Sequence, residues 1–293
     1  MRLVLDDPAT HLAFGQGANR RARPNTLLAR VLLEDWLFGP DRADDATVGE
    51  AARALTGWFV IRNRLRFIDR EFDLRPKTLW GQTGPWNRDD LARLATRRPE
   101  TRLRLARALY RTFVAEEPDP PAEWLAPLAE RLGPEGRLPD ALDLIFRSRL
   151  FLSPQAIGRR VKSPVELAIG LVRALGGLIP TEPLAGDLGR LGQNLAAPPT
   201  PRGWPAGTDW ITNQIWPLRR ELIEALLAPD GRYKGRLDPA RRLANGEPAA
   251  PRDADQLFAL LAPAPGPMPP RLKEVPLPDL VRRLVRDPVH QLA

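Results

Sequence analysis

Apolar residues recur every three or four positions along most of the chain, a spacing typical of helices that bury one face. In one segment, Leu105, Leu109 and Phe113 stand four residues apart and predict a stripe that faces a core. At Ser163-Pro164, a capping serine precedes a proline at the first helical position, which marks a helix start. The pattern predicts helices over residues 25–38, 47–55, 88–97, 101–114, 121–132, 139–151, 164–175 and about 218–226.

One short segment has a different pattern. Residues 58–68 place β-branched and aromatic side chains on both sides of the polar triplet Arg62-Asn63-Arg64. Such runs around a short polar turn predict a β hairpin. The segment that follows, 72–86, is rich in Pro, Gly and Trp, and we expect it to be a loop.

Two proline-rich stretches interrupt the helical pattern. Residues 191–213 carry four prolines between Pro198 and Pro205, which no helix or central strand tolerates. From Pro229 to Pro278 there are eleven prolines, with short helical signals at 255–261 and 278–285. We therefore expect a mainly α fold, an irregular multi-helix bundle with a small β hairpin near 58–68. Residues 1–228 would form the helical domain, and 229–293 a Pro-rich arm with short docking helices.

Composition restricts the possible chemistry. The 293 residues include no cysteine and two histidines, His11 and His290, far apart in the sequence. Neither a disulfide nor a cysteine or histidine metal site is expected, and no motif for a cofactor is present, so we predict no metal and no cofactor. No apolar run approaches the roughly 18 residues of a membrane span, so no transmembrane segment is expected.

The net charge of +8 raises the question of nucleic-acid binding. Of the 44 basic residues, 40 are arginines, and they alternate with carboxylates along the predicted helices. That distribution is typical of solvated, ion-paired faces rather than of one basic patch. We therefore predict no nucleic-acid partner.

Two groups of polar residues in the first third of the chain are candidate sites. Asn25, Arg30 and Glu34 share one predicted helix, and the last two stand four apart, so they can pair. They either form part of a polar site or are a cap and a surface ion pair. Arg53 and Trp58 close the following helix, where the guanidinium could clamp a ligand anion or tie two helices together.

The other candidates lie in loops. Asp73 and Lys77 could bind substrate or exchange protons, or could be a salt bridge that fixes the loop. A later set combines one cation, one amide and two indoles, the ingredients of a carbohydrate or peptide subsite. Its tryptophans could equally fasten the loop to the core. This set is Lys162, Gln193, Trp204 and Trp210.

Several of these stretches, read in order, resemble the bacterial domain-of-unknown-function family 1800. The segment from Ala52 to Trp58 reads A-R-A-L-T-G-W, which is similar to a signature of that family almost letter for letter. The other matching stretches are Asp7-Pro8-Ala9, Pro24 to Gly39, Lys77-Thr78 with Gly81, Val161 to Pro164, Gly192-Gln193 to Trp210, and Asp287-Pro288 to Gln291.

The resemblance implies an uncharacterised helical protein in an exported or envelope-associated process, with a protein of domain-of-unknown-function family 1501 as a possible partner. The family's histidine-containing N-terminal half does not precede Met1, so the chain resembles its C-terminal portion. Thr26, Val31 and Phe72 replace two glutamates and a histidine of the family pattern.

Two functions follow as hypotheses, and whether the chain is an enzyme stays open. The first is a binding or interaction protein. The alternative is a hydrolase acting on an extracellular polymer such as a polysaccharide, either active or inactive in this shortened form, with Glu34 and Asp73 as acid–base candidates. Localisation is likewise open: cytoplasmic for the chain as given, exported if a signal peptide lies upstream.

Overall fold

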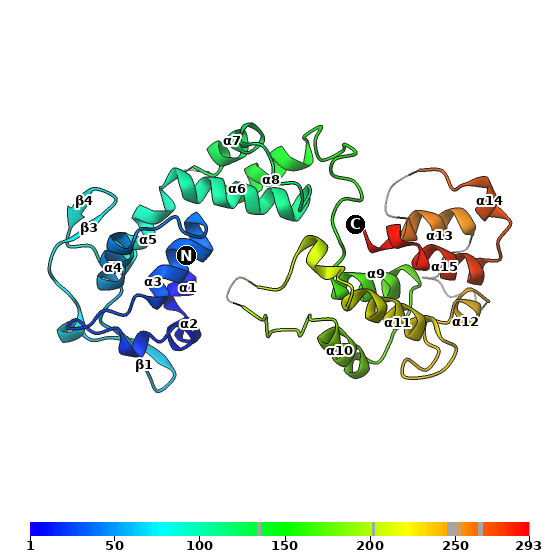
Figure 1. Cartoon of the computed structure of the whole chain (residues 1–293), viewed down its shortest axis with the longest axis horizontal. Coiled ribbons are helices and arrows are strands. Elements are labelled where there is room, and N and C mark those ends of the chain that lie inside the picture. The colour runs from blue at the N-terminus through cyan, green and yellow to red at the C-terminus, as the bar shows by residue number, and fades with distance from the viewer. Residues whose placement is uncertain (134–135, 201–202, 245–250, 252, 263–265, 293) are drawn as a thin grey trace. The chain divides into compact units, whose positions relative to one another are not determined.

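The structure is a computed structural model that describes residues 1–133, 136–200, 203–244, 251, 253–262 and 266–292 (Figure 1). It is mainly α-helical with two small antiparallel hairpins, which confirms the predicted fold class. The α-helices are α1 (Arg2–Asp6), α2 (Pro8–Ala13), α3 (Leu27–Arg30), α4 (Asp45–Ala54), α5 (Arg88–Thr96), α6 (Pro99–Phe113), α7 (Ala122–Arg131), α8 (Leu138–Phe146), α9 (Pro164–Ala174), α10 (Thr181–Arg190), α11 (Ile215–Leu227), α12 (Pro239–Ala244), α13 (Ala254–Leu261), α14 (Pro270–Lys273) and α15 (Leu277–Arg286).

The chain forms two compact units, each with its own apolar core. Unit 1 consists of residues 1–109 and 120–144, and unit 2 of residues 110–119 and 145–293. The core of unit 1 joins α3, the π-helical segment η2 (Val31–Phe38), α4 and α5. Leu28, Leu32 and Leu55 are fully buried there. The helix predicted over 25–38 is therefore present as α3 and η2, with a change of pitch at Val31.

The predicted hairpin is present as β1 (Trp58–Ile61) and β2 (Arg64–Phe67), with Trp58 opposite Phe67. A second hairpin, β3 (Lys77–Leu79) with β4 (Gln82–Gly84), forms inside the segment that we expected to be a loop. Its turn is Trp80-Gly81, and both residues have positive φ, the backbone geometry of a tight two-residue hairpin. The sequence hid this hairpin because a tryptophan is unusual at such a position.

At several helix starts, a polar side chain directly before the helix caps its first turn. Asn87 and Asp90 form a reciprocal capping box at the start of α5, and Ser163 with Glu166 forms another at α9. The second one confirms the helix start predicted at Ser163-Pro164. At α4 the cap is instead Asp44, whose carboxylate accepts the main-chain N–H of Thr47 at 2.7 Å. The sequence from Thr47 to Glu50, T-V-G-E, predicts a capping box with Thr47 as the cap. In the structure, Glu50 binds Arg53 and the main-chain N–H of Thr78.

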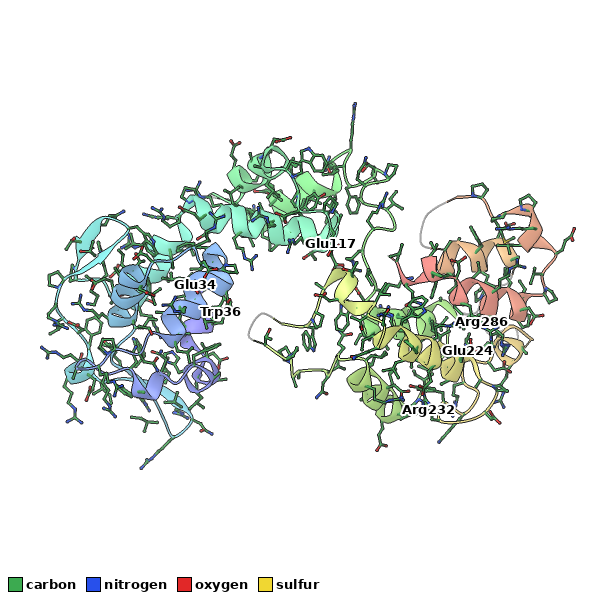
Figure 2. The ribbon with its side chains drawn as sticks, viewed as in Figure 1. Glu34, Trp36, Glu117, Glu224, Arg232 and Arg286 are labelled. Carbon is green, nitrogen blue, oxygen red and sulfur yellow. The ribbon has the colours of Figure 1, made fainter. Side chains whose placement is uncertain are left out.

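Unit 2 has α9 and α11 at its centre, packed against α13 and α15 (Figure 1). Its core includes Leu171, Leu226 and Val281, which come from three of these helices. On the surface of the same unit, Arg286 forms an ion pair with Glu224 at 2.6 Å and so ties α15 to α11 (Figure 2).

The Pro-rich stretch after 229 contributes to this core through several short elements. The domain boundary at residue 228 stays a prediction. Residues after 228 include fully buried side chains that belong to the same apolar cluster as those of α9 and α11. Among them are Tyr233, Leu237 and Leu257. Among the helices in the described part of the chain, none is long and apolar enough to cross a membrane.

Two glycines of unit 2 allow a matched test of backbone constraint. Gly235 has φ +62°, and a Cβ there would lie 2.1 Å from the carbonyl oxygen of Pro229. Gly170 is exposed in α9, and a Cβ there meets nothing within 4 Å. We expect Gly235→Ala to lower the free energy of unfolding by about 2 kcal/mol or more, and Gly170→Ala to raise it by about 0.5–1 kcal/mol. Urea denaturation of both variants checks this, and equal effects would contradict it.

Candidate functional site

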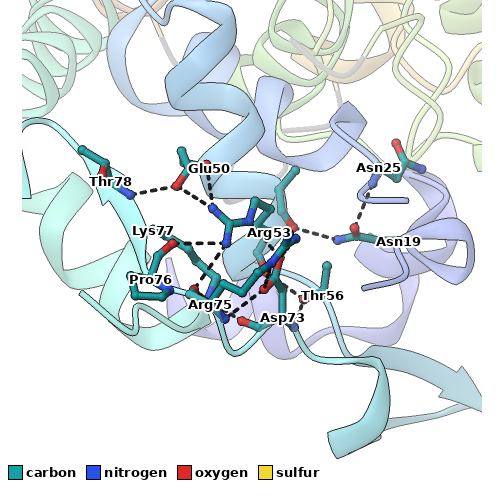
Figure 3. Close-up of polar contacts among 11 residues, drawn as sticks. Asn19, Asn25, Glu50, Arg53, Thr56, Asp73, Arg75, Pro76, Lys77 and Thr78 are labelled. Atoms are coloured by element: carbon teal, nitrogen blue, oxygen red, sulfur yellow. Dashed lines mark hydrogen bonds and ion pairs between the residues drawn. The ribbon is translucent and has the colours of Figure 1, made fainter. Parts of the chain in front are cut away.

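Asp73 is the centre of a charged network in unit 1 (Figure 3). Its side chain is fully buried and accepts hydrogen bonds from Arg53 Nε at 2.8 Å and from Arg75 Nη2 at 2.6 Å. The main-chain N–H of Arg75 and its Nε reach the other carboxylate oxygen, each at 3.0 Å. The structure therefore brings together Arg53 and Asp73, two candidates that the sequence placed in separate groups and that are 20 residues apart.

Glu50 and Lys77 extend the network. Glu50 accepts from Arg53 Nη1 at 2.8 and 2.9 Å and from the main-chain N–H of Thr78 at 2.8 Å. Lys77 is also fully buried, and its Nζ donates to the carbonyl oxygen of Asp73 at 2.5 Å. The ammonium lies 4.7 Å from the centre of the Phe72 ring. Burial lowers the pKa of Lys77.

This network is well suited to holding a loop and poorly suited to proton transfer. Hydrogen bonds from Arg75 and Arg53 outweigh burial and hold the pKa of Asp73 well below its usual range. Both carboxylate oxygens are occupied, so a substrate would have to displace an arginine to reach Asp73. The geometry favours the interpretation that Asp73, Arg53 and Lys77 fasten residues 73–78 to the end of α4.

The polar residues at the start of α3 are also engaged within the fold. Asn25 donates through Nδ2 to the carbonyl oxygen of Gly15 at 2.9 Å and accepts from the main-chain N–H of Leu27 at 3.0 Å. Arg30 pairs with Glu34 at 2.8 Å and with Asp45 at 2.5 Å. Hydrogen bonds from Arg30 to Asp45 and its pairing with Glu34 raise the pKa of that guanidinium. The ion pair that the sequence left as an alternative is present, whereas the N-cap residue of α3 is Thr26 rather than Asn25.

Trp58 makes a cation–π contact with Arg88 rather than with Arg53, its neighbour in the sequence motif. The guanidinium of Arg88 lies 3.8 Å from the centre of the Trp58 ring, and its donors bind Asp6 and the carbonyl oxygen of Leu5. No contact between Arg53 and this ring is recorded among the described residues. Trp58 therefore joins the hairpin to α5 and to the end of α1.

Lys162 and Gln193 flank the start of α9. Lys162 donates through Nζ to the carbonyl oxygen of His290 at 2.7 Å, and burial lowers its pKa to about 8. Gln193 accepts the main-chain N–H of Val165 at 2.8 Å. Both side chains therefore hold neighbouring segments of unit 2 together.

The two tryptophans of the Pro-rich loop differ in exposure. Trp210 is only 4% exposed and lies in the short helix η4 (Gly207–Trp210). Trp204 is partly exposed, and its Nε1 donates to the carbonyl oxygen of Asn194 at 3.3 Å. The burial of Trp210 and the hydrogen bond of Trp204 agree with the alternative that these rings fasten the loop.

A pocket of about 440 Å³ in unit 2 gathers residues that the sequence did not single out. The end of α6 and the segment after it supply Arg111, Thr112, Glu116 and Glu117, the last labelled in Figure 2. Arg160 lies on another wall, and Ala206, Gly207 and Asp209 complete the lining. We call it the carboxylate pocket, because Glu116, Glu117 and Asp209 all line it.

The two arginines of this pocket already have acidic partners. Arg111 pairs with Asp119 at 2.9 Å, and Arg160 with Glu166 at 2.7 Å. For Glu117 and Asp209, no ion pair is recorded within the part of the chain that the structure describes. Glu117 accepts a long contact of 3.5 Å from the hydroxyl of Thr208. The charge left over in the pocket is therefore negative.

Glu116 is the most perturbed carboxyl of the pocket. Burial raises its pKa, and Arg160 and the main-chain N–H groups of Val161 and Gly207 oppose the shift only in part. Its Oε2 atom is buried and has no hydrogen-bond partner among the described residues. An uncompensated buried oxygen of this kind can accept a donor from a ligand.

The sequence did contain a signal for this pocket. Residues 116–121 read E-E-P-D-P-P, an acidic, Pro-rich segment directly after a long helix, and loop carboxylates of this kind are good functional candidates. What the sequence could not supply is the partner loop at 206–209, about ninety residues later. In the described residues, no group of three or more histidine, aspartate or glutamate side chains is arranged to hold a metal ion.

The comparison with protein families gives one match. The model of a family described as "Protein of unknown function (DUF1800)" matches residues 7–290, nearly the whole chain. This confirms the family resemblance; that the chain is only the C-terminal portion of the family domain stays a prediction. No curated protein and no solved structure matches the chain.

The Asp73 network makes a stability prediction with a defined pH dependence. Asp73→Asn leaves Arg53 without its buried counter-charge, and we expect the free energy of unfolding to fall by about 3 kcal/mol near neutral pH. Because the folded-state pKa of Asp73 is lowered, its stabilisation is present above the unfolded-state pKa of about 3.9 and is lost as pH falls below it. The difference between wild type and variant should therefore shrink in acid.

Urea denaturation at neutral pH and at about pH 3 measures this difference. Asp69→Asn, an exposed carboxylate in the same segment, is the matched control and should change stability by less than about 0.5 kcal/mol. A fully stable Asp73→Asn protein would instead support a role for Asp73 in chemistry.

Proposed function

Because the chain belongs to the DUF1800 family, whose function is unknown, we propose from its own geometry that it is a binding protein with its ligand site in the carboxylate pocket of unit 2. The pocket volume of about 440 Å³ lies in the range of sites for small molecules. The observation that carries the proposal is the unpaired negative charge of Glu117 and Asp209 beside the uncompensated oxygen of Glu116.

This chemistry selects a small cationic ligand, such as an amine. An ammonium group donates up to three hydrogen bonds and accepts none, so it complements a wall of carboxylate oxygens. An anionic ligand would meet uncompensated like charge, since Arg111 and Arg160 are held by Asp119 and Glu166. The proposed ligand is therefore an amine.

The hydrolase alternative has less support at the residues first suggested for it. Glu34 and Asp73 are both engaged by arginines, which leaves neither free to act on a polymer. A role in an exported or envelope-associated process, and a partner from domain-of-unknown-function family 1501, stay predictions from the family resemblance. The binding proposal depends on neither.

Removal of the two unpaired carboxylates tests the site. We expect the chain to bind putrescine, a compact diamine, and Glu117→Gln combined with Asp209→Asn to weaken binding by about tenfold, since each exposed ion pair contributes about 0.5–1 kcal/mol. Glu274→Gln, an exposed carboxylate elsewhere in unit 2, should leave the affinity unchanged. Isothermal titration calorimetry gives the dissociation constants. Absence of binding to wild type, or equal affinities in the double variant and the control, would refute the proposal.

Glu116 predicts how amine binding depends on pH. Its raised pKa means that it is protonated and neutral in acid and gains its charge only as pH rises through that pKa. Amine binding should therefore tighten as pH rises from about 4.3, the ordinary pKa of a glutamate, towards neutral. The charged groups around it are Arg111, Glu117, Arg160, Glu166 and Asp209.

The variant Glu116→Gln cannot titrate, so it should remove most of this pH dependence. Putrescine itself stays protonated throughout that range, which leaves the protein as the source of any change. The same titrations repeated across pH provide the measurement. An unchanged pH profile in Glu116→Gln would assign the titration to another group.

A further inference from the structure

A second pocket, of about 360 Å³, adjoins the carboxylate pocket in unit 2. The two share Thr112 and Arg160 in their walls, so they lie next to each other. The rest of this second pocket is almost entirely apolar. Its lining residues are Phe113, Val114, Phe151, Leu152, Ala156, Ile157 and Gly158.

This apolar pocket has an aromatic side and an open mouth. Phe146 connects Phe113 and Phe151 by edge-to-face contacts, with ring centres 5.3 and 5.2 Å apart. Leu152 is 71% exposed and Phe113 is 36% exposed, although both line the pocket. Apolar side chains that line a concavity and remain in water favour a ligand that covers them.

From these adjoining pockets we infer that the ligand is an amine attached to an apolar, preferably aromatic, group. Its ammonium would face Glu116, Glu117 and Asp209, and its ring would lie in the apolar pocket. This inference rests on the proposed function, because it specifies the ligand of the same site.

The acidic wall of the carboxylate pocket and the apolar wall of the second pocket meet where the two pockets adjoin. An ammonium alone would leave the apolar wall hydrated, whereas a purely apolar ligand would leave the carboxylates unpaired. Arg160 lies at the boundary, where its guanidinium pairs with Glu166 at 2.7 Å and also favours the charged form of Glu116. No ion pair joins it to Glu117 or Asp209 within the described residues. An edge-to-face arrangement with Phe113 or Phe151 would favour an aromatic ring over a linear chain.

A ligand series tests the inference by isothermal titration calorimetry on the full chain. The probes are ethylamine, phenethylamine and 2-phenylethanol, which separate the charge from the ring. We expect phenethylamine to bind at least about tenfold more tightly than ethylamine, because burial of a ring adds to the charge interaction. The alcohol, which carries the ring without the charge, should bind more weakly than phenethylamine.

Two variants locate the ring. Leu152→Ser should reduce the affinity for phenethylamine several-fold and leave that for ethylamine unchanged; its high exposure makes misfolding a minor concern. Ala156→Trp fills the apolar pocket and should have the same selective effect. Leu178→Ser is the matched control, since Leu178 is 83% exposed in the same unit and lines neither pocket.

Two peptide ligands, added to the same series, identify the source of such an amine. Phe-Gly-Gly presents the same ammonium and ring as the N-terminus of a chain, and its N-acetylated form lacks the charge. Affinity for the free peptide, but not for the acetylated one, would make N-terminal aromatic residues the source. Binding of phenethylamine alone would indicate a free small amine. Either result supports the chemistry that we infer.

Three outcomes would overturn the inference. Equal affinities for ethylamine and phenethylamine would show that the ligand needs no apolar group, and would leave the proposed amine-binding function unaffected. If no amine binds, both the further inference and the proposed function are wrong. A concentration-dependent dimer in sedimentation velocity that is lost in Leu152→Ser would show that a second copy covers the apolar pocket.

Discussion

Hydrogen bonds from buried and half-buried arginines to main-chain carbonyl groups are the interaction on which both units depend. A chain with 33 prolines has long irregular connections, and their buried carbonyl groups find no partner in helices or strands. A guanidinium carries five donors in a planar fork, so a single side chain can bind several carbonyl oxygens at once. These arginine–carbonyl pairs include Arg53 with Arg75 and Pro76, Arg88 with Leu5, Arg219 with Lys162, Arg242 with Leu175 and Gly176, and Arg282 with Leu227.

This use of arginine gives the basic composition a structural explanation. Arg219 is fully buried, and Arg88 and Arg242 are nearly so; each fixes a connection rather than presenting charge to solvent. Other arginines pair with carboxylates on the helix surfaces, as in the pair of Arg286 with Glu224. A net charge of +8 can therefore accompany a fold whose guanidinium groups are largely committed to holding it together.

In the carboxylate pocket, by contrast, acidic side chains rather than arginines carry the uncompensated charge. It forms where the acidic segment after α6 meets the Pro-rich loop around Gly207, and its arginines are already paired with other carboxylates. Burial raises the pKa of Glu116, and groups with perturbed pKa values are concentrated at functional sites. Its position next to an apolar pocket gives one concavity two kinds of surface.

The sequence by itself determined the elements whose causes are local. Helical spacing, the capping boxes at Asn87 and Ser163, and the β-branched runs around Asn63 act over a few residues, so they can be identified along the chain. The ordered motifs also sufficed for the family. The hairpin at Trp80-Gly81 escaped because its turn uses an atypical residue.

Only the tertiary structure decided which polar residues are occupied and which are available. In the sequence, Asp73 is a candidate for acid–base chemistry. In the structure, Arg53 binds one of its carboxylate oxygens and Arg75 binds both. The carboxylate pocket needs Glu116 and Asp209 side by side, and no pattern along the chain relates residues that far apart. Burial and pairing of charge depend on long-range packing, and for that reason spacing can propose a site but cannot show whether its groups are free.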